Sequence, residues 1–254
     1  MTKHLSLLLL LTCLCCHAAA VEEFGYRVLD KKPQPRDHYV QGLQIIDGSL
    51  YVGTGIRGES RLMRYNFTDG NLEKERKLHP KLFGEGVTVF GDRVYQLTWH
   101  ARMLLVFDRE NLEYSHNFRI RGEGWGITNN GTELVYSDGS DQLHFLSPDT
   151  GERSRSLSVT LRGRPLHRLN ELEWIDGKIW ANVILTDVIV IIDPANGQVT
   201  ATIDLSGLLP VVERQADTNV LNGIARDPAD GAIWVTGKRW PWLYRIELVP
   251  TGEQ

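Results

Sequence analysis

A short strand–turn–strand unit recurs along the chain and constrains the possible folds more than any other feature. Its clearest copy is the stretch 168–182, where polar residues precede an Asp176-Gly177 turn and an apolar strand follows. An Asp-Gly pair between two alternating apolar runs is typical of a β-hairpin. The copies begin at Gly42, Gly86, Gly126, Leu172 and Gly223. Their spacings of 44, 40, 46 and 51 residues fall in the range of propeller blades and similar arrays.

Each unit is followed by a second apolar run, which predicts a second hairpin. These runs begin at Leu62, Leu104, Leu143, Val188 and Leu243. With five units of four short strands and little helical periodicity, the sequence predicts an all-β fold, a five-bladed β-propeller. A strand over 24–30 would complete the last blade and close the ring, a loop is expected over 31–36, and a short helical turn over 208–213. A β-sandwich is the alternative, but it gives no reason for a fixed repeat.

The first twenty residues differ from the rest of the chain. Lys3 and His4 precede the apolar run 5–16, and three alanines end the segment at Ala20. This pattern predicts a secretory signal peptide over 1–20, followed by a single propeller domain over 21–254. The protein is therefore expected to be exported, as a periplasmic or secreted protein. A lipid anchor at Cys13 is the alternative, although Thr12 is bulkier than the residue expected before a lipidated cysteine.

Composition excludes several classes of function. All three cysteines lie within the predicted signal peptide, so the exported chain would have no disulfide and no thiolate site. The 28 Lys and Arg residues nearly balance 32 Asp and Glu residues, which argues against nucleic acid as a partner. The histidines show no HxH or HExxH spacing, so no zinc site is predicted.

Polar and aromatic residues stand at equivalent points of the repeat, close to the start or end of the first hairpin of each unit. The innermost strand of each propeller blade begins near the axis, so these side chains are expected to meet at one mouth. They are Gln41, Glu85, Trp99, Trp125, Asp138, Asn170, Glu171, Asn182, Asn222 and Lys238. Aromatic walls with a few placed polar groups are typical of a small-ligand site.

Nine short motifs follow one another at these points. Among them are Phe83-Gly-Glu-Gly-Val-Thr88, Gly122-Glu-Gly-Trp-Gly-Ile-Thr128, Leu169-Asn-Glu-Leu-Glu173 and Val235-Thr-Gly-Lys-Arg-Trp-Pro241. In this order the motifs resemble the plant-type glutaminyl cyclases, a family that also has bacterial members. The resemblance spans about Tyr39 to Leu248. It implies a five-bladed propeller with glutaminyl-peptide cyclotransferase activity, which converts N-terminal glutaminyl residues to pyroglutamate and releases ammonia.

The resemblance also implies roles for individual residues. Glu85 matches the catalytic glutamate, and one carboxyl group can take a proton from the attacking α-amine and return it to the leaving nitrogen. The positions that bind substrate or stabilise the γ-amide oxygen are matched by Gln41, Asn170 and Lys238. Trp99 and Trp125 would wall the pocket. Glu171 either holds the α-ammonium group or orients Asn170 or Lys238. Without the resemblance, Glu85 and Lys238 read as solvated surface charges and the two indoles as core aromatics.

One position departs from the family pattern and bears on the substrate. Ile184 stands where many relatives have tryptophan, which we expect to alter substrate affinity more than the reaction. The expected partners are peptides or proteins with an N-terminal Gln. The protein is expected to be a monomer, with no nucleic acid and no membrane contact unless it is lipid-anchored.

Catalysis is expected to need no cofactor. The resemblance allows a structural Ca²⁺ in the central channel, held largely by backbone oxygens. Two other functions remain open. One is a non-catalytic propeller that binds peptides or another protein, because fold does not fix function. The other is a Ca²⁺-dependent, lactonase-type hydrolase, which would need several carboxylates around a catalytic metal.

Overall fold

The computed structural model describes residues 20–253, which form β-strands with two short 3₁₀ turns. The predicted signal peptide lies outside these residues except for Ala20. Within the described part, no helix is both long and apolar enough to span a membrane. Because the described residues form strands and only two short 3₁₀ turns, the all-β prediction is confirmed.

Three of the sheets have four strands each, and each follows the chain order from strand to strand. The first contains β2 (Val40–Ile46), β3 (Ser49–Thr54), β4 (Arg61–Asn66) and β5 (Leu72–Lys77). The second contains β6 (Gly84–Phe90), β7 (Arg93–Thr98), β8 (Met103–Asp108) and β9 (Tyr114–Arg119). The third contains β10 (Ile127–Asn129), β11 (Leu134–Ser137), β12 (Gln142–Leu146) and β13 (Arg153–Ser158).

An eight-stranded sheet, in the order β16-β17-β18-β19-β1-β22-β21-β20, includes both ends of the described chain. One half contains β16 (Leu169–Ile175), β17 (Lys178–Val183), β18 (Val188–Ile192) and β19 (Val199–Asp204). The other half contains β20 (Leu221–Arg226), β21 (Ile233–Gly237), β22 (Trp242–Pro250) and β1 (Glu22–Pro33). The remaining elements are the small hairpin of β14 (Thr160–Leu161) and β15 (Arg164–Pro165), and the 3₁₀ turns η1 (Val211–Glu213) and η2 (Thr251–Glu253).

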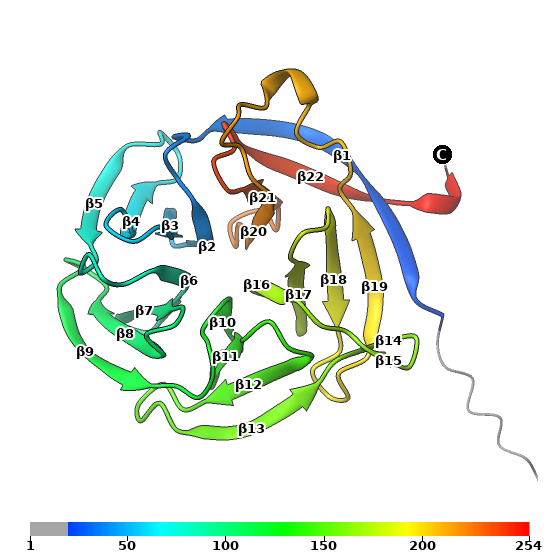
Figure 1. Cartoon of the computed structure of the whole chain (residues 1–254). Coiled ribbons are helices and arrows are strands. Elements are labelled where there is room, and N and C mark those ends of the chain that lie inside the picture. Colours follow the sequence, from blue (N-terminus) through cyan, green and yellow to red (C-terminus); the bar gives the residue numbers. More distant parts are fainter. Residues whose placement is uncertain (1–19, 254) are drawn as a thin grey trace, which may run out of the picture.

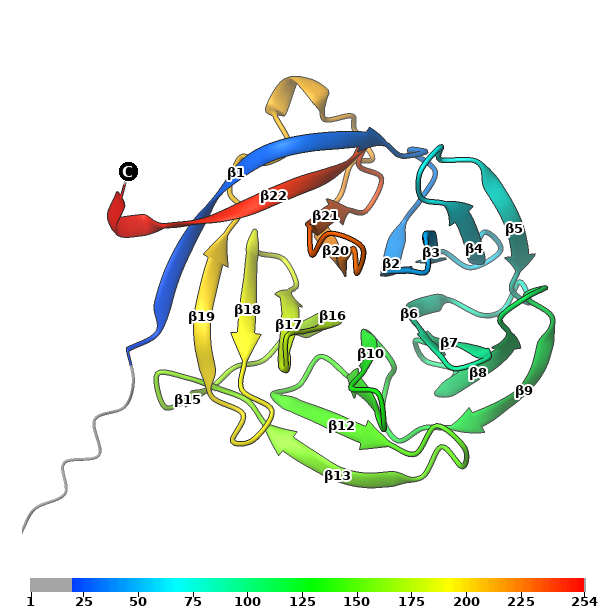
Figure 2. The same ribbon diagram turned by 180° about the vertical axis from the view of Figure 1, so that it is seen from behind.

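The sheets radiate from a common centre instead of stacking in two layers, and the eight-stranded sheet reaches the centre at both of its edges, through β16 and β20 (Figure 1). The same arrangement is seen from the opposite side, where β2, β6, β10, β16 and β20 point toward the centre (Figure 2). These innermost strands contact one another in the order β2, β6, β10, β16, β20 and back to β2. The fold is thus propeller-like, and a sandwich is excluded.

Strand β1 closes the ring. It pairs antiparallel with β22 over most of its length, from Phe24 opposite Pro250 to Pro33 opposite Trp242. At its start it also pairs in parallel with β19, for example Glu22 with Ala201. Pairing on both sides leaves no open edge at this point of the sheet. The strand is longer than the predicted 24–30 and occupies part of the segment 31–36, which we had expected to be a loop.

Apolar clusters fill the space between neighbouring sheets. Leu62 of the first sheet and Val94 of the second are fully buried in one such cluster. Another joins the first sheet to the last strands of the chain, through Met63 and Trp234. Each fully buried side chain of this size contributes about 1.5–3 kcal/mol of hydrophobic free energy. The cluster of Met63 and Trp234 connects early and late parts of the chain, so apolar packing adds to the strand pairing that closes the ring.

Glycines lie at or near the start of most of the inner strands because backbones approach each other closely there. A Cβ on Gly42 would lie 2.2 Å from the backbone nitrogen of Val87, and one on Gly126 would lie 2.0 Å from the backbone oxygen of Asn170. Real side chains do not tolerate such distances, so only glycine fits at these points. The recurring glycine in the sequence therefore marks the inner ring.

Two buried carboxyl groups connect the inner strands on the central side of the ring. Glu173 in β16 accepts a hydrogen bond from the backbone nitrogen of Arg226 in β20, at 3.3 Å, and one from Thr128 Oγ1 in β10, at 3.4 Å. Burial raises the pKa of Glu173 to about 8, and the bond from Arg226 opposes this shift. Burial also raises the pKa of Glu171 well above its ordinary value, with a further contribution from Glu173.

These raised pKa values predict that stability falls as pH rises. Unfolded Glu173 loses its proton near pH 4.5, whereas the folded group keeps it up to about pH 8. The stabilisation is therefore complete below the lower value and is lost across this window, with a slope of up to about 1.4 kcal/mol per pH unit for one proton. We expect Glu173→Gln to flatten the fall in the free energy of unfolding, measured by urea denaturation at pH 5, 6, 7 and 8. Parallel curves for the two proteins would contradict this role for Glu173.

Candidate active site

A cavity of about 260 Å³ opens where several inner strands begin. It is lined by Tyr39, Gln41, Phe83, Glu85, Trp99, Trp125, Asn170, Ile184 and Lys238. Six of the seven residues proposed from sequence for catalysis and substrate binding are in this set: Gln41, Glu85, Trp99, Trp125, Asn170 and Lys238. They come from β2, β6 and β16 and from loops beside β7, β10 and β21, so the ring brings together residues far apart in sequence.

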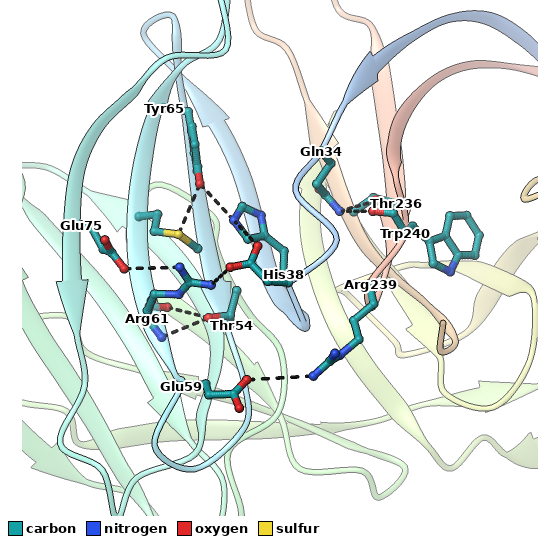
Figure 3. Close-up of polar contacts among 12 residues, drawn as sticks. Gln34, His38, Thr54, Glu59, Arg61, Tyr65, Glu75, Thr236, Arg239 and Trp240 are labelled. Atoms are coloured by element: carbon teal, nitrogen blue, oxygen red, sulfur yellow. Dashed lines mark hydrogen bonds and ion pairs between the residues drawn. The ribbon is translucent and has the colours of Figure 1, made fainter. Parts of the chain in front are cut away.

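The connection between β1 and β2, which leads to the cavity wall, is held by polar contacts on both sides (Figure 3). Buried Gln34 donates from Nε2 to Thr236 Oγ1 at 3.1 Å, and the backbone nitrogen of Arg239 donates to the backbone oxygen of His38 at 2.8 Å. His38 Nε2 lies 3.0 Å from the hydroxyl of Tyr65. These bonds join the N-terminal part of the chain to the segment that carries Lys238.

Aromatic rings form a continuous wall on one side of the cavity. Tyr39 meets the edge of Phe83 with ring centroids 6.3 Å apart, and Phe83 meets Trp99 at 5.4 Å. Such edge contacts contribute about 0.5–1.5 kcal/mol beyond their buried area. The ammonium of Lys238 lies 5.1 Å from the centre of the Tyr39 ring, within cation–π range. The wall therefore combines apolar surface with one cation.

Glu85 and Lys238 are the buried titratable groups of the cavity, with 4% and 3% of their surface exposed. Burial raises the pKa of Glu85 well above its ordinary value, the charge of Lys238 opposes the shift, and the charge of Glu123 adds to it. Burial lowers the pKa of Lys238 to about 8, against the effect of Glu85. Both shifts have the same cause, because burial favours the uncharged form of each group. Buried groups with such pKa values in a cavity are typical of acid–base sites.

A chain of side-chain amides sets which atoms face the cavity. Asn222 donates from Nδ2 to the backbone oxygen of Val40 at 3.0 Å, and a backbone oxygen can only accept, so this bond fixes the orientation of Asn222. Its Oδ1 then accepts from Asn170 Nδ2 at 2.8 Å, and its Nδ2 also donates to Gln41 Oε1 at 3.3 Å. Asn170 thus keeps its Oδ1 acceptor and one N–H of Nδ2, and Gln41 keeps its Nε2 donors.

Glu171, the seventh proposed residue, is not among the residues that line the cavity. It is fully buried, and its carboxyl oxygens accept hydrogen bonds from the backbone nitrogens of Leu43 at 3.2 Å and Ile224 at 2.9 Å. The pairing of β16 with β17 is irregular between Leu169 and Leu172, so regular alternation does not hold at this point, and Asn170 lines the cavity whereas Glu171 does not. The bonds of Glu171 connect β16 to β2 and β20.

Several residues of the cavity were not in the proposed set. Phe83 begins one of the motifs quoted above, Tyr39 stands where the resemblance begins, and Ile184, which departs from the family pattern, also lines the cavity. Glu123 was missed entirely, although it accepts hydrogen bonds from both cavity indoles. Its only sequence signal is a charged residue between two glycines beside a tryptophan.

The buried carboxyl groups of β16 are engaged within the protein. Both carboxyl oxygens of Glu171 face backbone N–H groups, and those of Glu173 face Arg226 N–H and the Thr128 hydroxyl. Among residues 20–253, no group of three or more His, Cys, Asp or Glu side chains is placed to hold a metal ion.

The fold and the cavity together define a propeller-like all-β protein whose axial pocket combines an aromatic wall with a buried acid–base pair. The chain belongs to the glutamine cyclotransferase family, whose model matches residues 4–248. It is similar to a glutaminyl-peptide cyclotransferase of Arabidopsis thaliana, at 35% identity over 230 residues, covering 87% of this chain and 70% of the relative. Its fold is similar to the crystal structure of Myxococcus xanthus glutaminyl cyclase, with a TM-score of 0.85 and 32% identity, covering 91% of this chain and all of the other.

Proposed function

We propose that this protein is a glutaminyl-peptide cyclotransferase that acts on peptides or proteins with an N-terminal Gln. The family supports the activity, as do the relatives named above. The observation that carries the mechanism is the position of Glu85, buried in an aromatic cavity with its pKa raised well above the ordinary value by burial. A carboxylate with a raised pKa is a stronger base, which favours removal of a proton from the substrate's α-amine.

The reaction then follows from the groups around Glu85. The ionised carboxylate takes a proton from the substrate's α-amino group, and the amine nitrogen attacks the γ-amide carbon. The new C–N bond closes the five-membered ring, and the carbonyl oxygen becomes an oxyanion. Protonated Glu85 then gives its proton to the amide nitrogen, the old C–N bond breaks, and ammonia leaves. Glu85 ends as it began, so no cofactor is consumed.

Other cavity groups are suited to binding the oxyanion and the amine of the substrate. Lys238 supplies a cation and Gln41 a free N–H donor, both suited to the developing oxyanion. Asn170 presents an oxygen acceptor, which suits an N–H of the substrate's amine. Trp99 and Trp125 exclude water from the cyclising side chain.

The architecture and processing of the chain form part of the proposal. We treat the eight-stranded sheet as two blades, β16–β19 and β20–β22 with β1, joined where β1 meets β19, so that the propeller has five blades. The ring of inner strands supports this division. We further propose that residues 1–20 are removed on export, that the remaining chain is one domain, and that the exported protein acts as a monomer.

A direct assay tests the activity. Protein of residues 21–254 is incubated with a Gln-initiated dipeptide, and cyclisation is expected to lower the substrate mass by about 17 Da as ammonia is released. The same dipeptide with an acetylated α-amine is the control, because its nucleophile is blocked. Activity is also expected to survive dialysis against EDTA, since no step above uses a metal. An unchanged mass with the free dipeptide would reject the proposal and favour a peptide-binding protein.

A further inference from the structure

One carboxylate holds both indoles of the cavity from outside it. Glu123 lies in the connection between β9 and β10, and its Oε2 accepts a hydrogen bond from Trp99 Nε1 at 2.6 Å and another from Trp125 Nε1 at 3.0 Å. Trp99 follows β7 of the second sheet, whereas Trp125 precedes β10 of the third. A single oxygen atom therefore ties together wall residues that belong to different sheets.

The backbone around Glu123 is shaped for this contact. Gly122 has a φ of +79°, a conformation that favours glycine, and a Cβ on Gly124 would lie 3.0 Å from side-chain atoms of Leu97. On the other side of Trp125, a Cβ on Gly139 would lie 2.5 Å from the indole ring, so the ring rests directly on the Gly139 backbone. Trp125 is thus fixed by packing on one side and by Glu123 at its N–H.

The second oxygen of Glu123 is also engaged. His100 Nδ1 lies 3.1 Å from Glu123 Oε1, and the His100 ring stacks on Trp99 with centroids 3.8 Å apart and an angle of 23°. Trp99 is therefore held at its N–H and across one face. Hydrogen bonds from the two indoles and the proximity of His100 lower the pKa of Glu123, although its burial acts the other way. The group is thus a carboxylate at neutral pH.

We propose that Glu123 is a positioning residue whose carboxylate fixes the separation and tilt of the two indoles that enclose the substrate's glutaminyl side chain. This role rests on the proposed function, because it concerns the same cavity. Indole N–H groups that are bonded outside the cavity leave only ring faces toward the substrate. One acceptor atom shared by the two N–H groups couples the positions of the rings, so loss of that acceptor would let each ring move independently.

Two variants separate geometry from charge. Glu123→Gln removes the charge but keeps one amide oxygen, and one oxygen is all that the two indoles use. Glu123→Ala removes the acceptor as well. We expect KM for a Gln-initiated dipeptide to rise about 10-fold or more in the Ala variant, with a smaller change in kcat, and to stay within about 3-fold in the Gln variant. The matched control is Glu213→Ala, because Glu213 accepts the indole N–H of Trp242, which is not among the cavity residues.

The hydrogen bonds of Glu123 to the two indoles can also be measured without substrate. In the NMR spectrum of the seven tryptophans, two indole N–H signals are expected to move in Glu123→Ala, and a different one in Glu213→Ala. If the wild type shows no cyclase activity, the proposed function fails, but these signals still test whether Glu123 holds the two indoles. Unchanged Trp99 and Trp125 signals in the Ala variant would overturn the inference. So would a KM in Glu123→Gln as high as in Glu123→Ala, because charge and not the shared acceptor would then be decisive.

Discussion

Replacing Glu85 by glutamine is expected to lower kcat for a Gln-initiated dipeptide about 10²- to 10⁴-fold, the range that general acid–base groups contribute. Glutamine has nearly the same shape but takes up no proton at neutral pH, so neither proton transfer of the cyclisation has a carrier. Initial rates of ammonia release at saturating dipeptide measure the effect. KM is expected to change little, because the cavity keeps its walls.

Two controls make this result specific. Glu173→Gln removes a carboxyl group that is similarly buried, at 5% exposure against 4% for Glu85, but lies outside the cavity, and its kcat is expected to match the wild type. The thermal unfolding of Glu85→Gln is expected at or above the wild-type temperature, because a buried ionisable group has been replaced by a neutral one. Full activity in a folded Glu85→Gln protein would remove Glu85 from the mechanism.

Replacing Lys238 by methionine is expected to lower kcat/KM about 10²- to 10³-fold, the usual cost of losing one oxyanion partner. Methionine keeps much of the apolar stem, so the loss reflects the missing ammonium. Lys178→Met is the control, since it removes a partly exposed lysine that pairs with Asp193 at 2.8 Å on the protein surface. Equal kcat/KM values for the two variants would show that Lys238 does not act on the substrate.

The loss of Lys238 is also expected to change how kcat/KM depends on pH. The ammonium loses its proton as pH rises through about 8, so in the wild type it contributes a decline of kcat/KM on the alkaline side. Its charge also lowers the pKa of Glu85, whereas Glu123 raises it. In Lys238→Met the alkaline decline due to this group disappears, and the pKa of Glu85 rises, so the acid limb moves to higher pH. A profile with both limbs unchanged would contradict the coupling between the two groups.

Local patterns in the sequence determined the class of fold and most of the cavity residues. Alternation of apolar residues, Asp-Gly turns and a repeat near forty residues depend only on neighbours in the chain, and they predicted radial sheets whose inner ends meet. The repeat placed Gln41, Glu85 and Lys238 among the side chains expected to meet at one mouth, and the family resemblance singled them out within that set. The recurrent glycines belong to the same local signal, although the close approach of backbones that requires them is visible only in the structure.

The tertiary structure decided how these residues work. Glu171 adjoins Asn170 in sequence, yet it binds backbone groups of two other inner strands and does not line the cavity. The pKa of Glu85 depends on burial and on charges that are distant in sequence, and the amide orientations depend on one bond to Val40. The Glu123 contacts join loops of two sheets. Such properties arise from distances between segments, which the repeat pattern does not specify, so only the assembled ring determines them.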